Sequence, residues 1–198
     1  MNPDLERAAQ ALDSRLELLE IPRSKLPVEL WQPVEDRFPG IVPEWFKRLL
    51  ADFAFMEVYL DLPRWDGEPY GANFNFWTPE DGEWDRVDLE DVAPKGWFPF
   101  AEEADGNFWA FRAGAPEDSP IILIEHTGGG LDCENGWYYA AHNLAHLLSV
   151  GSISAGRKEH LLPSGFVDLS KSGFQMWGDE DSFLIRHGIK DAKAKLRS

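Results

Sequence analysis

The sequence predicts an α+β domain in which an antiparallel meander of strands is flanked by helices. Three observations support this fold class. A helical spacing of apolar residues fills most of the first 53 residues, runs of strand length separated by Gly, Pro and Asp continue to residue 125, and a helical spacing returns over residues 137–149. Strands that follow one another through short turns favour antiparallel hairpins over parallel strands with crossover helices.

The length and charge of the chain limit what it can do. Its 198 residues fit one domain with a sizeable core. With 35 acidic and 19 basic residues the formal net charge is −16, which argues against binding nucleic acid or an anionic membrane through a basic face. Residues 1–150 hold 29 Asp and Glu against 11 Lys and Arg, whereas residues 151–198 hold 6 against 8. We therefore predict a domain over residues 1–150 and a C-terminal extension over residues 151–198, which either packs on the domain or trails from it.

Cysteine usage and the N-terminal segment indicate the compartment. Cys133 is the single cysteine, so an intramolecular disulfide cannot form and a reducing compartment is favoured. The first residues are charged and amphipathic, without the apolar stretch of a signal peptide, and no apolar run approaches the length of a membrane span. We expect a cytoplasmic protein.

Two helices are predicted before the strands. The first begins near Pro3 and ends near Ile21, because its apolar residues recur at spacings of three and four: Leu5, Ala8, Ala9, Leu12, Leu16 and Leu19. Residues 22–40 are rich in proline and are predicted to form a loop over the body. The second helix covers residues 41–53, with Pro43 near its start, where the fixed φ of proline suits a helix.

The strands are predicted from short alternating or β-branched runs. These runs lie at residues 55–62, 70–77, 84–90, 97–100, 107–111 and 120–125. The central hairpin is the most distinctive, because two aromatic runs flank an acidic turn that ends in Asp105-Gly106, and Gly can take the positive φ that such a turn needs. Pro99 within the first aromatic run indicates a strand that is at an edge or only partly paired. The simplest interpretation of the aromatic residues is a buried core hairpin.

Five segments of the chain occur in a recognisable order. They are a helix reading Pro-Glu-Trp-Phe-Lys-Arg-Leu-Leu (43–50), a strand reading Trp-Phe-Pro-Phe-Ala (97–101), an acidic turn ending Asp-Gly-Asn (105–107), an Ile-rich strand ending Glu-His (125–126) and a closing helix. This order resembles the SUKH superfamily, which includes a yeast regulator of cell-wall synthesis and many bacterial immunity proteins against polymorphic toxins. The resemblance covers about residues 27–150. Its most specific part is residues 98–107, where the family has an apolar-Pro-apolar step, a Gly followed by Asp or Asn, and an apolar strand.

The resemblance implies a binding scaffold and not an enzyme. An immunity protein of this class binds its cognate toxin and neutralises it. An acidic surface would suit a basic toxin such as a nuclease, because complementary charge speeds encounter. Asn107 stands where the family frequently has Asp, and the helix at 43–53 lacks the Asn-Gly step that often follows it. The same resemblance leaves open an intracellular regulatory scaffold that binds several partners.

We place the partner contacts in the acidic turns. The carboxylates fall in three clusters: Glu80, Asp81 and Glu83; Asp88, Glu90 and Asp91; and Glu102, Glu103 and Asp105. Trp65, Trp84 and Trp109 are candidate aromatic anchors, because Trp is enriched at binding hot spots. The alternative for each cluster is solvated surface that keeps the protein soluble, and the alternative for each Trp is a place in the core. The sequence leaves the oligomeric state open.

A third hypothesis is a small metal-dependent hydrolase. His142 and His146 stand four residues apart in the helix predicted over residues 137–149, a spacing that can hold one metal ion. A third ligand could come from nearby residues: His126, Asp132, Cys133 and Glu134. However, Asn143 occupies the position in which a metalloprotease has the Glu that activates water. We therefore expect no catalytic residue, no metal and no other cofactor.

Overall fold

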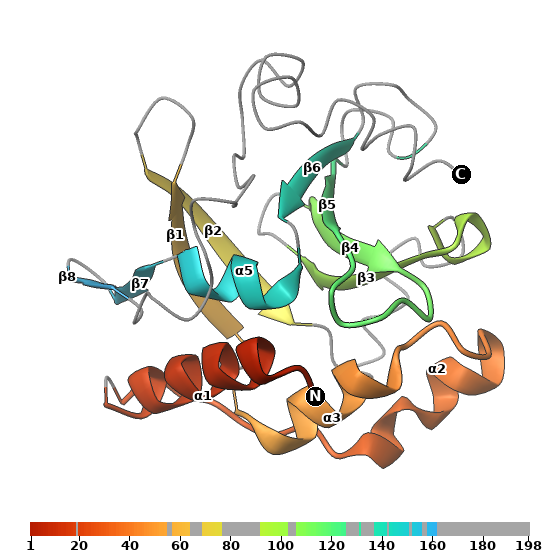
Figure 1. Ribbon diagram of the computed structural model, residues 1–198, viewed down its shortest axis with the longest axis horizontal. Helices are drawn as coiled ribbons and strands as arrows, with labels where there is room; N and C mark the ends of the chain where they lie inside the picture. The colour runs from red at the N-terminus through yellow and green to blue at the C-terminus, as the bar shows by residue number, and fades with distance from the viewer. Residues whose placement is uncertain are drawn as a thin grey trace.

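The chain folds into helices that pack against one antiparallel sheet (Figure 1), which confirms the α+β class. The structure, a computed structural model, describes residues 1–18, 20–54, 57–63, 69–76, 92–102, 106–125, 131, 137–141, 143–150, 152–155 and 158–161. The helices are α1 (Pro3–Leu18), the 3-10 turn η1 (Val28–Trp31), α2 (Gln32–Arg37), α3 (Glu44–Asp52), the 3-10 turn η4 (Ala93–Lys95) and α5 (Leu144–Val150). The strands are β1 (Glu57–Pro63), β2 (Pro69–Phe76), β3 (Trp97–Glu102), β4 (Phe108–Arg112), β5 (Ile121–Ile124), β6 (Trp137–Ala141), β7 (Ser152–Ala155) and β8 (Lys158–Leu161).

The sheet is a meander with an addition at one edge. Within the described residues the strand order is β6-β5-β4-β3-β2-β1-β7-β8, and all neighbouring strands are antiparallel. Because β1 to β6 are neighbours in chain order, the described strands form an antiparallel meander, in which β2 pairs directly with β3 and β6 takes the place of part of the predicted helix. Helix α5 then carries the chain from the β6 edge to the opposite side, where β7 pairs with β1. The segment after residue 150 therefore begins by extending the sheet.

The first helix forms where the sequence predicts it. Pro3 occupies its first position, and the side chain of Asn2 accepts a hydrogen bond from the backbone N–H of Asp4 at 2.9 Å, which satisfies one of the unpaired donors at the helix start. The predicted apolar face is buried: Leu5, Ala8, Ala9, Leu12 and Leu16. This face packs on α5, and the two alanines allow the helices to approach closely. Helix α5 is therefore covered by α1 on one side and by the sheet on the other (Figure 1).

The structure differs from the expected secondary structure in two segments. Residues 22–40 were expected to be loop, but η1 and α2 lie within them; six-residue helices are too short to show a periodic pattern, and Pro33 fits the first turn of α2. The helix predicted over residues 137–149 is wrong in its first part, because residues 137–141 form β6 and α5 begins only at Leu144. The predicted strand at 84–90 lies outside the described residues.

Two interactions explain why the chain changes from strand to helix near residue 142. The run Trp-Tyr-Tyr in β6 has high strand propensity and pairs with β5. The side chain of Asn143 then accepts a hydrogen bond from the backbone N–H of His146 at 2.8 Å, which caps α5 at its true beginning. The helical spacing read over residues 137–149 was therefore partly coincidental.

The central hairpin β3–β4 confirms two local predictions. Gly106 in its turn has a φ of +87°, in the left-handed region that favours glycine. Pro99 pairs with Ala110 of β4, whereas among the described residues β2 reaches only Ala101 and Glu102 of β3. The β3–β4 register shifts between Pro99 and Ala101, so the ladder is interrupted beside the proline, as expected for a partly paired strand.

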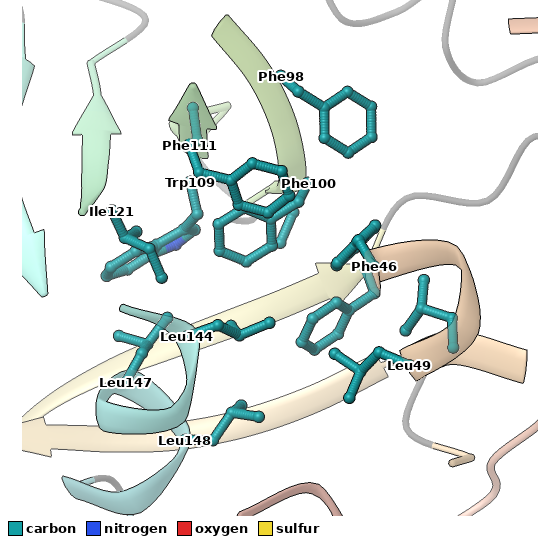
Figure 2. Close-up of a cluster of buried hydrophobic side chains, with 14 of the residues drawn as sticks. Phe46, Leu49, Phe98, Phe100, Trp109, Phe111, Ile121, Leu144, Leu147 and Leu148 are labelled. Carbon is teal, nitrogen blue, oxygen red and sulfur yellow. The ribbon is translucent and has the colours of Figure 1, made fainter. Parts of the chain in front are cut away.

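The core is centred on the ring of Phe46 from α3 (Figure 2). Its centroid lies between 5.3 and 6.0 Å from the ring centroids of Trp31, Phe98, Phe100 and Phe111, all in edge-to-face arrangements. These partners come from η1, β3 and β4, so one side chain joins the helices to the centre of the sheet. Aromatic pairs of this geometry contribute about 0.5–1.5 kcal/mol each beyond the area they bury.

We predict that Phe46→Ala lowers the free energy of unfolding by about 3–5 kcal/mol, because the cavity would remove contacts from four rings at once. The matched control is Arg48→Ala in the same helix, an exposed position that should change stability by less than about 0.5 kcal/mol. Urea denaturation followed by tryptophan fluorescence measures both. A loss at Phe46 no larger than the loss at Arg48 would show that this ring does not organise the core.

Candidate functional site

Two connections of the meander start at the same end of the sheet. Glu102 of β3 pairs with Phe108 of β4, Phe108 with Ile124 of β5, and Ile124 with Trp137 of β6. These residues form one row across four neighbouring strands, about 14 Å wide at the usual strand spacing. The chain leaves the row after β3 and after β5, and it returns at the start of β4 and of β6.

Acidic residues are concentrated at this end. Glu102 and the two connections, residues 103–107 and 125–136, contain six carboxylates and no Lys or Arg: Glu102, Glu103, Asp105, Glu125, Asp132 and Glu134. We call this set the acidic end. Glu102 and Glu125 are its carboxylates among the described residues, and both are half-buried. Like charges gathered at one end of a protein create a local negative potential that attracts basic partners.

The structure describes only part of the predicted site. Glu102 lies at the acidic end as the final residue of β3. Trp109 is 0 % exposed, so its interpretation as a surface anchor is wrong and the core alternative holds for it. The remaining predicted contacts lie outside the described residues: Trp65, Glu80, Asp81, Glu83, Trp84, Asp88, Glu90, Asp91, Glu103 and Asp105.

Sequence reasoning did not group Glu125, Asp132 and Glu134 with the predicted contacts. The signal was present in the meander itself, because in an antiparallel meander every second connection lies at the same end of the sheet. Applied to the predicted strands, this rule unites the connection after β3 with the connection after β5. The connection that contains residues 80–91 leaves β2 at Phe76, which pairs with Ala101 beside Glu102, so the strand pairing does not separate its start from the acidic end.

The opposite end of the sheet is joined to the helices by backbone contacts of the β4–β5 connection. The indole N–H of Trp45 donates to the carbonyl of Ala115 at 2.7 Å, and the N–H of Gly114 donates to the carbonyl of Ile41 at 3.4 Å. The N–H of Asn2 donates to the carboxylate of Glu117. The carboxylate of Glu117 thus has a structural role, which distinguishes this end of the sheet from the acidic end.

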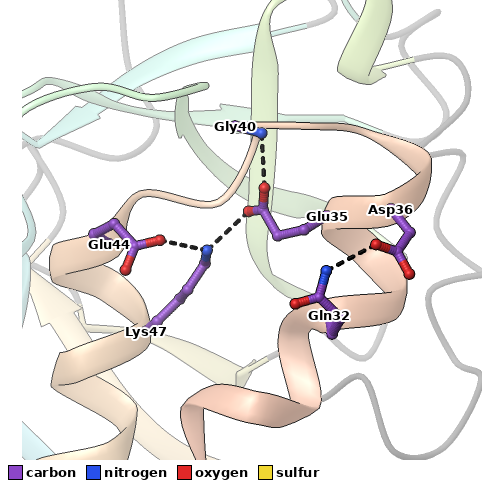
Figure 3. Close-up of polar contacts among 6 residues, drawn as sticks. All are labelled: Gln32, Glu35, Asp36, Gly40, Glu44 and Lys47. Atoms are coloured by element: carbon purple, nitrogen blue, oxygen red, sulfur yellow. Dashed lines mark hydrogen bonds and ion pairs between the residues drawn. The ribbon is translucent and has the colours of Figure 1, made fainter.

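A separate cluster of charges joins α2 to α3 (Figure 3). The ammonium of Lys47 lies 2.6 Å from Glu44 Oε1 and 3.0 Å from Glu35 Oε1. The other oxygen of Glu35 accepts the N–H of Gly40 at 2.7 Å. The side chain of Lys47 is 7 % exposed, whereas those of Glu35 and Glu44 are 19 % and 70 % exposed. Glu35 is therefore the more deeply placed partner of this buried cation.

The cluster keeps Lys47 charged. Burial acts to lower the pKa of Lys47, but its bonds to Glu44 and Glu35 outweigh burial and raise the pKa above its ordinary value of 10.5. The hydrogen bond from Lys47 in turn lowers the pKa of Glu44. A lysine that serves as a base or nucleophile needs a lowered pKa. Lys47 is thus suited to holding the two helices together.

The predicted histidine pair is not formed on one helix. Helix α5 begins at Leu144, so His142 precedes it and lies outside the described residues, and the four-residue helical spacing to His146 does not apply. His146 is 1 % exposed. In the part of the chain that the structure describes, no group of three or more His, Cys, Asp or Glu could hold a metal ion.

Comparisons with protein-family models, characterised proteins and solved structures gave no significant match to this chain. Among the helices within the described ranges, none combines the length and the apolar character needed to cross a membrane. The chemistry of the site is therefore argued from this chain's own residues.

We predict that Lys47→Met lowers the free energy of unfolding by about 3 kcal/mol at pH 7, because it leaves the charge of Glu35 without its partner in a mostly buried position. Glu44→Gln should cost less than about 1 kcal/mol, since Glu44 is largely exposed. The raised pKa means that the contribution of Lys47 is complete below pH 10.5 and is lost as the pH rises through the folded-state pKa. Urea titrations between pH 7 and 12 measure this. A gap between wild type and Lys47→Met that stays constant above pH 10.5 would contradict it.

We expect the purified protein to carry less than about a tenth of an equivalent of zinc, against about one equivalent for a structural or catalytic site. Elemental analysis after purification without chelators measures the content. Stoichiometric zinc that disappears in His142→Ala would restore the metal hypothesis, whereas zinc retained in that variant would point to other ligands.

Proposed function

We propose that this chain is a non-enzymatic protein-binding domain whose acidic end contacts a basic protein partner. The observation that carries the proposal is the pairing of Glu102, Phe108, Ile124 and Trp137 in one row. Glu102 and the two connections that start from this row together contain six carboxylates and no Lys or Arg. A surface of one sign is complementary to a partner of the opposite sign and disfavours partners of like charge.

The resemblance to the SUKH superfamily supports a specific version of this proposal. In that version the protein is an immunity protein that binds a cognate bacterial toxin and neutralises it, a basic nuclease being the toxin that best suits the charge. The α+β class and the unbroken meander agree with the order of segments on which the resemblance rests. The aromatic strand and the Gly106-Asn107 step occupy the centre of the sheet and its turn.

Binding by this surface would be governed by electrostatic attraction. The partner approaches under a long-range field, so the association rate exceeds the value of about 10⁵–10⁶ M⁻¹s⁻¹ typical of uncharged surfaces. The field is screened over about 8–10 Å at physiological salt, and the association rate therefore falls as salt is added. The buried hairpin β3–β4 and its neighbours give the connections firm starting points, which limits the ordering cost of binding.

The first test is affinity capture of partners from the source cell at low and high salt, with identification by mass. One small basic protein that survives the washes supports immunity. Several weakly held partners indicate a regulatory scaffold instead. Retention of only acidic proteins would contradict the proposed surface.

With the partner in hand, we predict that the double charge reversal Glu103→Lys/Asp105→Lys lowers its association rate constant about tenfold at low salt, because the attractive field is reduced. The control is Glu29→Lys/Asp52→Lys, which changes the net charge equally at two exposed positions on the helices. Stopped-flow or surface-based kinetics at several salt concentrations measure both. If both variants lowered the association rate constant equally, the effect would come from the total charge of the protein and not from the acidic end.

A further inference from the structure

One carboxylate makes two different contacts where the helices meet the sheet. Each oxygen of Glu35 has its own partner: Oε1 forms an ion pair with the ammonium of Lys47 at 3.0 Å, and Oε2 accepts a hydrogen bond from the backbone N–H of Gly40 at 2.7 Å (Figure 3). The first contact joins α2 to α3, and the second fixes the loop between them. Hydrogen bonds to a charged group are among the stronger ones in proteins.

The loop that Glu35 holds also touches the sheet. The carbonyl of Ile41 accepts the N–H of Gly114 in the β4–β5 connection at 3.4 Å. Gly114 has a φ of +63°, and a Cβ added there would lie 3.4 Å from the carbonyl oxygen of Gly40. Two backbones are therefore in direct contact, and the long hydrogen bond between them is a weak one. The geometry of this junction depends on where the loop before α3 is held.

We propose that Glu35 is a charge latch: neutralising its carboxylate releases Pro39 and Gly40 and opens the junction of this loop with Gly114 of the β4–β5 connection, while the sheet stays folded. Buried side chains and a hydrogen bond of α3 limit how far the junction can open. Ile41 and Val42 are buried on one side of the loop, and the bond from Trp45 to Ala115 is made by α3 and not by the loop. The segment that opens therefore comprises Pro39, Gly40 and Gly114. The latch is independent of the function proposed above.

The chain offers a matched pair of variants. Glu35→Gln supplies one oxygen for two donors, so its amide group must turn its own N–H₂ toward either Lys47 or Gly40. Glu44→Gln makes the same chemical change beside the same lysine, but its side chain has only Lys47 to satisfy, and one oxygen is enough for that. A difference between the two variants therefore reports the double contact of Glu35 and not the loss of one negative charge.

Amide hydrogen exchange followed by NMR tests the latch. In Glu35→Gln, the amides of Gly40 and Gly114 should exchange about tenfold faster or more relative to those of β4, the size expected from losing one charge-assisted hydrogen bond. In Glu44→Gln they should change less than about twofold, since an exposed ion pair contributes little. Unchanged rates at Gly40 and Gly114 in Glu35→Gln, acceleration spread evenly over β4, or equal acceleration in Glu44→Gln would each overturn the proposal.

The wild-type protein provides a second measurement if Glu35→Gln does not fold. As denaturant is raised below the unfolding transition, the free energy of opening measured at the amides of Gly40 and Gly114 should show one common dependence on denaturant. It should lie well below the free energy of opening measured at the amides of β4. Two separate curves, or curves that join only at global unfolding, would contradict a shared local opening.

Discussion

The contact between the ring of Phe46 and the aromatic residues of β3 and β4 is the interaction on which the arrangement depends. The place of helix α3 on the sheet is fixed by apolar burial and edge-to-face packing. Trp31 brings η1 to the same centre. Once α3 is set, the Lys47 cluster and the bond from Trp45 to Ala115 follow from its position. The polar contacts refine an orientation that the aromatic core creates.

The antiparallel order of the strands decides where charge accumulates. Because alternate connections share an end, Glu102 and Glu125 lie at one end of the sheet although they are far apart in the chain. The other end of β4 and β5 is occupied by contacts to the helices, among them those of Gly114 and Glu117. In the described residues the sheet thus has one end that is held by contacts to the helices and another end at which Glu102 and Glu125 lie.

Local sequence rules accounted for the features that depend on neighbours in the chain. The buried stripe of α1, the meander and the left-handed Gly106 follow from spacing and turn chemistry. Tertiary features were missed: residues 137–141 became a strand because β5 offers them partners, and β7 joined β1 across more than ninety residues. The burial of Lys47 was equally hidden, because its acidic partner Glu35 lies in a helix too short to leave a pattern. The acidic end could be predicted only in part, since its connections meet through pairing.

The close approach of Gly114 to Gly40 also bears on how this chain can change over evolutionary time. Gly114 has a φ of +63°, a backbone conformation that residues with a side chain rarely adopt, and a residue added to the β4–β5 connection would displace the loop before α3. Insertions, deletions and altered lengths should therefore be rare in the β4–β5 connection among descendants of this sequence.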